Sequence, residues 1–186
     1  MCSVFTNTVS GPPSSKRADV PPISRRRFRW NDDTVVVDLP DFEQQMLRTV
    51  LPQLRELVMT ESDPALRRLS PTARPDDDQA EAAYRDMVDN DLLRSRLEAI
   101  ELVEDGVGGT TLDDDGIAAW MHSLNALRLV LGERLDIDVI GHEALEDLPD
   151  DDERVGVVEL YEWLGWLLEQ LVAAAMRSLP EGDDER

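Results

Sequence analysis

The chain has 186 residues, of which 41% are hydrophobic, and this is enough for one domain with a sizeable core. Its formal net charge of −21 would repel a phosphate backbone, so we expect no nucleic-acid partner for the chain as a whole. Cys2 is the single cysteine and there are two histidines, which excludes an internal disulfide and a cysteine-based metal site. We expect neither a metal nor a cofactor.

The charge is unevenly distributed along the chain. Residues 1–30 hold six basic residues and one acid, a net charge of +5, whereas the remaining 156 residues hold 13 basic and 39 acidic residues, a net charge of −26. Residues 1–24 are rich in Ser, Thr, Pro and Gly, which predicts a disordered arm. Residues 181–186 form an acidic tail, and residues 25–180 are predicted to form a single helical domain.

No segment has the pattern of a signal peptide or a membrane span. Residues 1–10 are mostly polar, and the last apolar run, residues 155–176, is interrupted by Glu159, Glu162 and Glu169. We therefore expect a cytoplasmic protein with no membrane contact.

The first predicted elements are a β-hairpin over residues 26–39 and a helix that begins at Pro40-Asp41. Asp41 and Gln44 are placed for a capping box, and Pro52 should kink the helix. The apolar positions predict a buried stripe made of Phe42, Met46, Val50, Leu54, Leu57 and Val58.

Two further helical segments are predicted before the middle of the chain. A short turn covers residues 62–69, and a long helix runs from residues 75–78 to Glu104, with a kink or a new N-cap at residues 89–91. After a glycine-rich loop, Thr111 and Asp114 are placed to cap the next helix.

Residues 117–135 have the strongest helical pattern in the chain. Their apolar stripe consists of Ile117, Trp120, Met121, Leu124, Leu127, Leu131 and Leu135. Leu129 and Val130 lie on the opposite side, so neighbouring elements should cover this helix on both sides. Arg128 falls about 20° from Ile117, within the apolar stripe.

The remaining chain predicts one more long helix. Residues 137–140 are expected to be extended or a loop, residues 143–148 form one helical turn, and Asp150-Asp151-Asp152 starts the last helix. Its predicted seam is Val157, Tyr161, Leu164, Leu168, Leu171 and Ala175. The pattern predicts a mainly α, single-domain antiparallel bundle of about four long helices with a small N-terminal β-hairpin.

Several motifs resemble an actinobacterial family catalogued as a domain of unknown function, number two thousand and seventeen. They include Arg26-Arg27-Phe28, Arg68-Leu69-Ser70-Pro71, Tyr84-Arg85, Asp91-Leu92-Leu93 and, above all, residues 120–132. The resemblance covers residues 25–180. It implies a relation to oxidative-stress-responsive transcriptional regulators of the AosR type. A sensor built on a thiol pair within one chain cannot operate here, because Cys2 has no second cysteine.

The basic run Arg25, Arg26, Arg27 and Arg29 is the first candidate site. It is either a patch for nucleic acid or an acidic partner, or a charged edge strand whose arginines pair with the protein's own acids. We favour the second interpretation.

Arg128, with Asn125 one turn before it, is either an anion site or a buried polar centre in which Arg128 pairs with a carboxylate of another helix. The buried pair is the favoured interpretation. His122 has no matching nucleophile and acid, so no catalytic residue is assigned. The aspartate triplets that begin at residues 76, 113 and 150 are explained by helix capping rather than by metal binding.

Trp166 lies opposite the predicted seam of the last helix, among polar residues. Either the hairpin covers it, or it belongs to a partner or dimer surface, where aromatic residues are enriched.

Together with the regulatory role that the resemblance implies, these observations favour a non-enzymatic cytoplasmic protein that acts in gene regulation through protein contacts, either with a partner such as the transcription machinery or within a homodimer. A direct DNA-binding regulator that uses residues 25–29 is the alternative. A third hypothesis, an enzyme or metabolite-binding protein with an anion pocket at Arg128, has no nucleophile or base to support it.

Overall fold

A computed structural model describes residues 26–60, 78–141, 143–146 and 148–178. The predicted arm, the turn at 62–69 and the acidic tail lie outside these residues. The elements are, in chain order, β1 (Phe28–Asn31), β2 (Thr34–Val37), α1 (Asp41–Thr60), α2 (Asp78–Gly106), β3 (Thr110–Leu112), α3 (Asp114–Arg134), α4 (Ile137–Ile140), α5 (Glu143–Glu146), α6 (Val155–Ala175) and the 3-10 turn η2 (Met176–Ser178).

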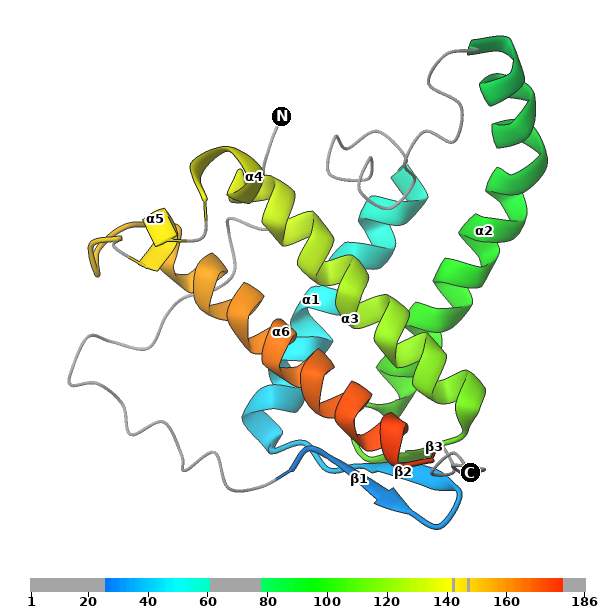
Figure 1. Cartoon of the computed structure of the whole chain (residues 1–186), viewed down its shortest axis with the longest axis vertical. Coiled ribbons are helices and arrows are strands. Elements are labelled where there is room, and N and C mark those ends of the chain that lie inside the picture. Colours follow the sequence, from blue (N-terminus) through cyan, green and yellow to red (C-terminus); the bar gives the residue numbers. More distant parts are fainter. Residues whose placement is uncertain (1–25, 61–77, 142, 147, 179–186) are drawn as a thin grey trace, which may run out of the picture.

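The helices are arranged around α3. α3 packs mainly against α6 and α2, and α1 packs against α2 and, to a smaller extent, α3. Figure 1 shows α3 and α6 side by side and antiparallel, with α1 crossing behind them and the sheet lying across one end of the helices. The expected mainly helical fold with a small sheet is confirmed.

The sheet contains a strand that the sequence pattern did not predict. β1 and β2 form the expected hairpin, and β3 pairs antiparallel with β2, with Val35 opposite Leu112 and Val37 opposite Thr110. Thr111 is therefore a strand residue and not a helix cap. Asp113 caps α3 instead, because its carboxylate accepts a hydrogen bond from the backbone N–H of Gly116 at 2.9 Å.

Three other predicted elements differ in the structure. α2 continues without interruption through residues 89–91, and residues 137–140 form the short helix α4. α6 begins at Val155, after the aspartate triplet. Asp152 accepts hydrogen bonds from the backbone and the guanidinium of Arg154 at 2.8–3.0 Å, and the guanidinium hydrogen bond lowers the pKa of Asp152 to about 2.

The predicted stripe of α3 is buried, together with a second face. Ile117, Trp120, Leu124, Leu127 and Leu131 are all less than a tenth exposed, and so are Ser123 and Val130 on the other side. The ring of Trp120 meets that of Phe28 edge-on, with 5.6 Å between centroids, and this contact joins α3 to β1. Neighbours cover α3 on both sides, as predicted.

The buried faces of α1 and α6 are rotated relative to the predicted stripes. In α1, Phe42 is 74% exposed, whereas Glu43 and Leu47 are buried. In α6, Leu164 and Leu171 are buried as expected, but Val157, Tyr161, Leu168 and Ala175 are half-buried. The buried positions of α6 are Val158, Leu160, Leu164, Leu167, Leu171 and Ala174, because α6 packs against both α3 and β1.

None of the described helices is long and apolar enough to cross a lipid bilayer.

Replacing Trp120 with alanine should lower the free energy of unfolding by about 3–5 kcal/mol, because the change leaves a cavity where α3 meets the sheet. Urea denaturation measures the difference. Phe42→Ala is the matched control, since its ring is exposed, and it should change the stability by no more than about 0.5 kcal/mol. Similar losses for both variants would contradict the described core.

Candidate functional site

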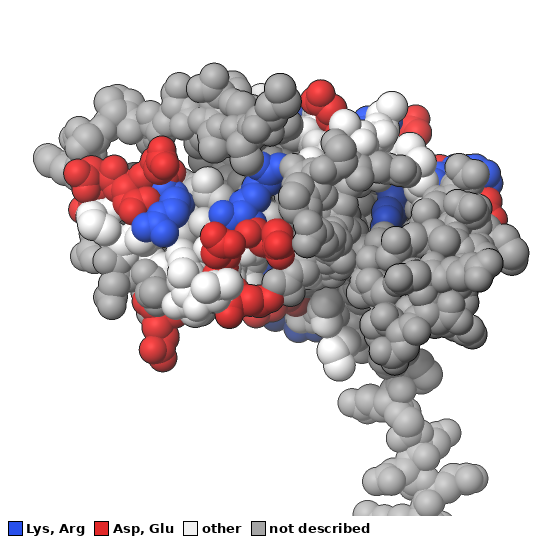
Figure 2. Space-filling view, turned by 90° about the horizontal axis from the view of Figure 1, so that it is seen from above, with Lys and Arg blue, Asp and Glu red and all other residues white. Residues whose placement is uncertain are grey.

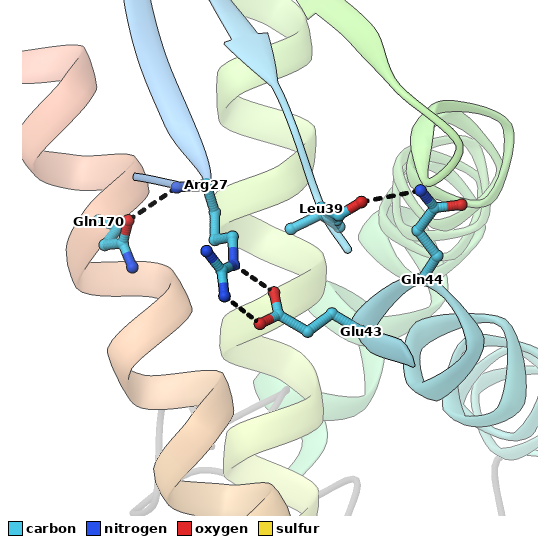
Figure 3. A network of polar contacts seen from close by, with 5 residues as sticks. All are labelled: Arg27, Leu39, Glu43, Gln44 and Gln170. Atoms are coloured by element: carbon cyan, nitrogen blue, oxygen red, sulfur yellow. Dashed lines mark hydrogen bonds and ion pairs between the residues drawn. The ribbon is translucent and has the colours of Figure 1, made fainter. Parts of the chain in front are cut away.

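Arg27, immediately before β1, is held by its backbone as well as by its side chain. Its N–H donates to Oε1 of Gln170 in α6 at 2.9 Å, and its carbonyl accepts from the N–H of Asp38 at 2.9 Å. Figure 3 shows that the side chain then turns toward the start of α1. Arg27 thereby connects α6, the end of the hairpin and α1.

The guanidinium of Arg27 forms a buried, two-pronged ion pair with Glu43. Nε and Nη2 donate to the two carboxylate oxygens, each at 2.7 Å (Figure 3). The side chains are only 8% and 11% exposed. The hydrogen bond to Glu43 raises the pKa of Arg27 above its usual value. Geometry of this kind offsets the cost of removing both charges from water.

Glu43 stands near the predicted capping box, but the box does not form in the expected way. The side-chain amide of Gln44 donates to the carbonyl of Leu39 at 2.8 Å (Figure 3). Two adjacent residues at the start of α1 thus contact the hairpin segment: Glu43 binds Arg27, and Gln44 binds the carbonyl of Leu39.

Arg27 also covers Trp166, with its Cζ atom 5.4 Å from the centre of the indole ring. This distance is within the range of cation–π attraction. Trp166 is half-buried, so the segment leading into the hairpin covers part of the ring and part remains at the surface.

The other members of the basic run differ from Arg27. Arg26 is exposed, and Arg29 lies 3.8 Å from Asp38, with both side chains more than half exposed. Exposed pairs of this kind contribute little to stability. Arg25 lies outside the described residues. Arg27 and Arg29 thus lie near acids of the same chain, Glu43 and Asp38. This is the interpretation that we favoured from the sequence.

Arg128 is half-buried between α3 and α6. Its Nη2 donates to the hydroxyl of Tyr161 at 3.2 Å, and its Cζ atom lies 4.8 Å from the centre of the Tyr161 ring. Within the described part of the chain, none of the ion pairs includes Arg128. The prediction that Arg128 pairs with a carboxylate of a neighbouring helix is wrong within the described residues. The ring of Tyr161 lies beside the guanidinium instead.

Gly165 allows this close approach of the two helices. A side-chain carbon at position 165 would lie 3.2–3.3 Å from three atoms of the Arg128 guanidinium. The guanidinium therefore lies flush against α6, where Tyr161 and Gly165 are one turn apart.

A cavity of about 110 Å³ lies beside Arg128. Its lining includes Asn125, Arg128, Gly132 and Glu133 of α3, Asp138 of α4, and Tyr161 of α6. Asn125, Arg128 and Gly132 share one helical face, since they are three and four positions apart. Asp136 adopts a left-handed conformation, φ 51°, in the turn that brings α4 to this face. The structure thus brings Arg128 and Asn125 together at one site.

Several residues of these two clusters were not predicted. Glu43 follows a recognisable signal, since positions 43, 47, 50, 54 and 57 alternate by four and three and are all buried. The exposed Phe42 obscured that register. Tyr161 was assigned to the apolar seam, and no sequence signal marked Gln170 as the partner of Arg27.

Among the described residues, no group of three or more His, Cys, Asp or Glu side chains is placed to hold a metal ion.

Residues 25–175 match the family described as Domain of unknown function (DUF2017), and the chain belongs to this family. No solved structure matches the chain at a significant level.

The similar curated proteins carry a regulatory name. The chain is 32% identical, over 133 residues, to the Oxidative stress regulator AosR of Mycobacterium tuberculosis and of Mycobacterium bovis, covering 62% of this chain and 60% of those proteins. It is 35% identical, over 131 residues, to the Putative oxidative stress regulator AosR of Mycobacterium leprae, covering 61% and 59%. The matched region thus spans about 60% of the length of these relatives.

Glu43→Ala should lower the free energy of unfolding by about 3–5 kcal/mol, because it removes the carboxylate that accepts two hydrogen bonds from the buried guanidinium of Arg27. The double variant Arg27→Met with Glu43→Leu should recover most of that loss, since no charge then remains buried. Urea denaturation of both variants, with the exposed-pair variant Arg29→Met as the control, measures these differences. A double variant as unstable as Glu43→Ala would contradict a mainly electrostatic role for the pair.

Proposed function

We propose that this protein is a regulatory protein of the oxidative-stress response and that it acts by binding another protein, without a catalytic step. The observation that carries the proposal is the identity of 32–35% to proteins named as oxidative stress regulators. The match covers about 60% of those proteins. We therefore carry only the regulatory role over to this protein, and we argue the mode of action from its own residues.

The use of the basic residues supports a protein partner rather than DNA. In the described part of the basic run, Arg27 is buried against Glu43, and Arg29 lies near Asp38. Acidic side chains gather in several groups on the face shown in Figure 2, where they flank the basic ones. With a net charge of −21, the protein attracts a partner with a basic surface and repels phosphate.

The proposed contact surface consists of Trp166, which lies against Arg27, and Phe42, which precedes Glu43 in α1. Trp166 is half-buried beneath Arg27, and Phe42, next to Glu43, is 74% exposed. Aromatic residues at a rigid, partly exposed position contribute strongly to protein interfaces. The ion pair would hold the two side chains in a fixed relation before the partner arrives.

The full-length protein should bind random duplex DNA weakly or not at all near physiological salt, because a net charge of −26 follows the basic arm. Fluorescence anisotropy with a labelled duplex measures this binding. Submicromolar affinity that disappears when residues 1–29 are removed would overturn the proposal in favour of direct DNA binding by that segment.

Phe42→Ser should reduce partner capture and the response to oxidant in a host that lacks the chromosomal copy, and it should leave the thermal midpoint nearly unchanged. The matched control is Val139→Ser, since Val139 in α4 is 82% exposed and lies outside the proposed surface. Quantitative co-purification and the transcript response to peroxide measure the two effects. A Phe42→Ser strain that behaves like the Val139→Ser strain would contradict the proposed surface.

A further inference from the structure

We infer that the groove between α5 and the start of α6 binds a short basic segment of a partner protein, in which lysine or arginine residues flank an aliphatic anchor. The inference does not rest on the proposed function, because neither Phe42 nor Trp166 lines this groove. Figure 1 shows α5 beside the start of α6, at the end of α6 that lies away from the sheet.

The floor of the groove is apolar. Leu145 and Val158 are buried and pack with Leu135 in a small core of their own. Leu148 and Val155 are half-buried and line the groove beside them. The groove has a volume of about 320 Å³ and is open to solvent, so a side chain of a longer segment can enter it from outside. Binding grooves for peptides use such apolar floors to hold an anchoring side chain.

The rim of the groove is made of carboxylates. Asp150, Glu159 and Glu162 line the groove and are exposed. Within the described part of the chain, none of the ion pairs includes these three residues. Glu159 and Glu162 lie on one face of α6, since they are three positions apart. Their charges complement lysine or arginine residues on both sides of an aliphatic anchor.

The charge around the groove selects among the possible occupants. Residues 143–162 hold nine acidic residues and one basic residue, a net charge of −8, and the basic residue, Arg154, is bound to Asp152. A second copy of this chain would bring a net charge of −21 to this face, and a nucleic acid or an anionic lipid would bring phosphates. The local field repels all three and attracts a basic segment.

The first test uses the full chain and a fluorescein-labelled peptide, Arg-Lys-Leu-Ala-Leu-Lys-Arg, at about 0.15 M ionic strength, where charges more than about 8 Å apart are largely screened. We expect saturable binding by fluorescence anisotropy, and chemical-shift changes in ¹H–¹⁵N spectra at residues 148–162. A peptide with serine in place of both leucines should bind roughly tenfold more weakly or worse, because it has no anchor for the apolar floor. Equal affinity of the two peptides would overturn the inference in favour of general attraction to an acidic protein, and the absence of saturable binding by the leucine peptide would refute it.

Two paired variants locate the binding site. Glu159→Gln with Glu162→Gln should weaken binding of the leucine peptide by roughly threefold or more. The matched control is Glu98→Gln with Glu101→Gln, which removes the same charge from two exposed positions of α2, on the other side of α3 (Figure 1). It should change the affinity by less than about twofold, because distant charges are screened. Equal losses in the two variants would contradict the assignment to this groove.

A last variant tests the chain's own basic arm as the occupant. Lys16→Ser with Arg17→Ser in the full chain should leave the affinity for the leucine peptide unchanged, since we assign the groove to a partner protein. Binding that becomes roughly threefold tighter or more would show that the arm competes for the groove, and it would overturn the assignment to a partner.

Discussion

The burial of α3 on two sides is the constraint on which the rest of the structure depends. A helix with apolar residues on opposite faces cannot remain at a surface, so other elements must cover both faces. α6 and α2 flank it, and the sheet closes one end through the contact of Phe28 with Trp120. The hairpin is too small to be stable alone. Its packing against α3 stabilises it and fixes where it lies. The Arg27–Glu43 pair then connects the hairpin to α1.

The parts that could be predicted from the sequence are those with strong periodicity. The α3 stripe is apolar at nearly every predicted position, so its buried face was identified correctly. The buried face of α1 was not, because Phe42 is apolar but exposed, and Glu43 is charged but buried. Burial of an acid depends on a partner from another segment, and local pattern does not show one. β3 is only three residues long, and α2 continues through residues 89–91, where the sequence predicted a kink or a new N-cap.

The candidate sites follow the same division between local and long-range information. Arg128 was located from its place in a helical stripe, but its neighbour is the aromatic Tyr161 and not a carboxylate. A tyrosine in a seam is equally compatible with packing and with contact to a cation, and periodicity does not distinguish the two. The two arginines that lie against α6 thus have different environments. The guanidinium of Arg27 donates two hydrogen bonds to the carboxylate of Glu43. The guanidinium of Arg128 lies over the ring of Tyr161, beside a cavity.

The central claim is that the buried Arg27–Glu43 pair holds the hairpin on the helices. The most direct measurement is the water-exchange rate of the Nε proton of Arg27, compared with that of Arg29, whose side chain is more than half exposed. We predict slow exchange for Arg27 and rapid exchange for Arg29. Exchange of the Arg27 proton as rapid as that of Arg29 would contradict the claim.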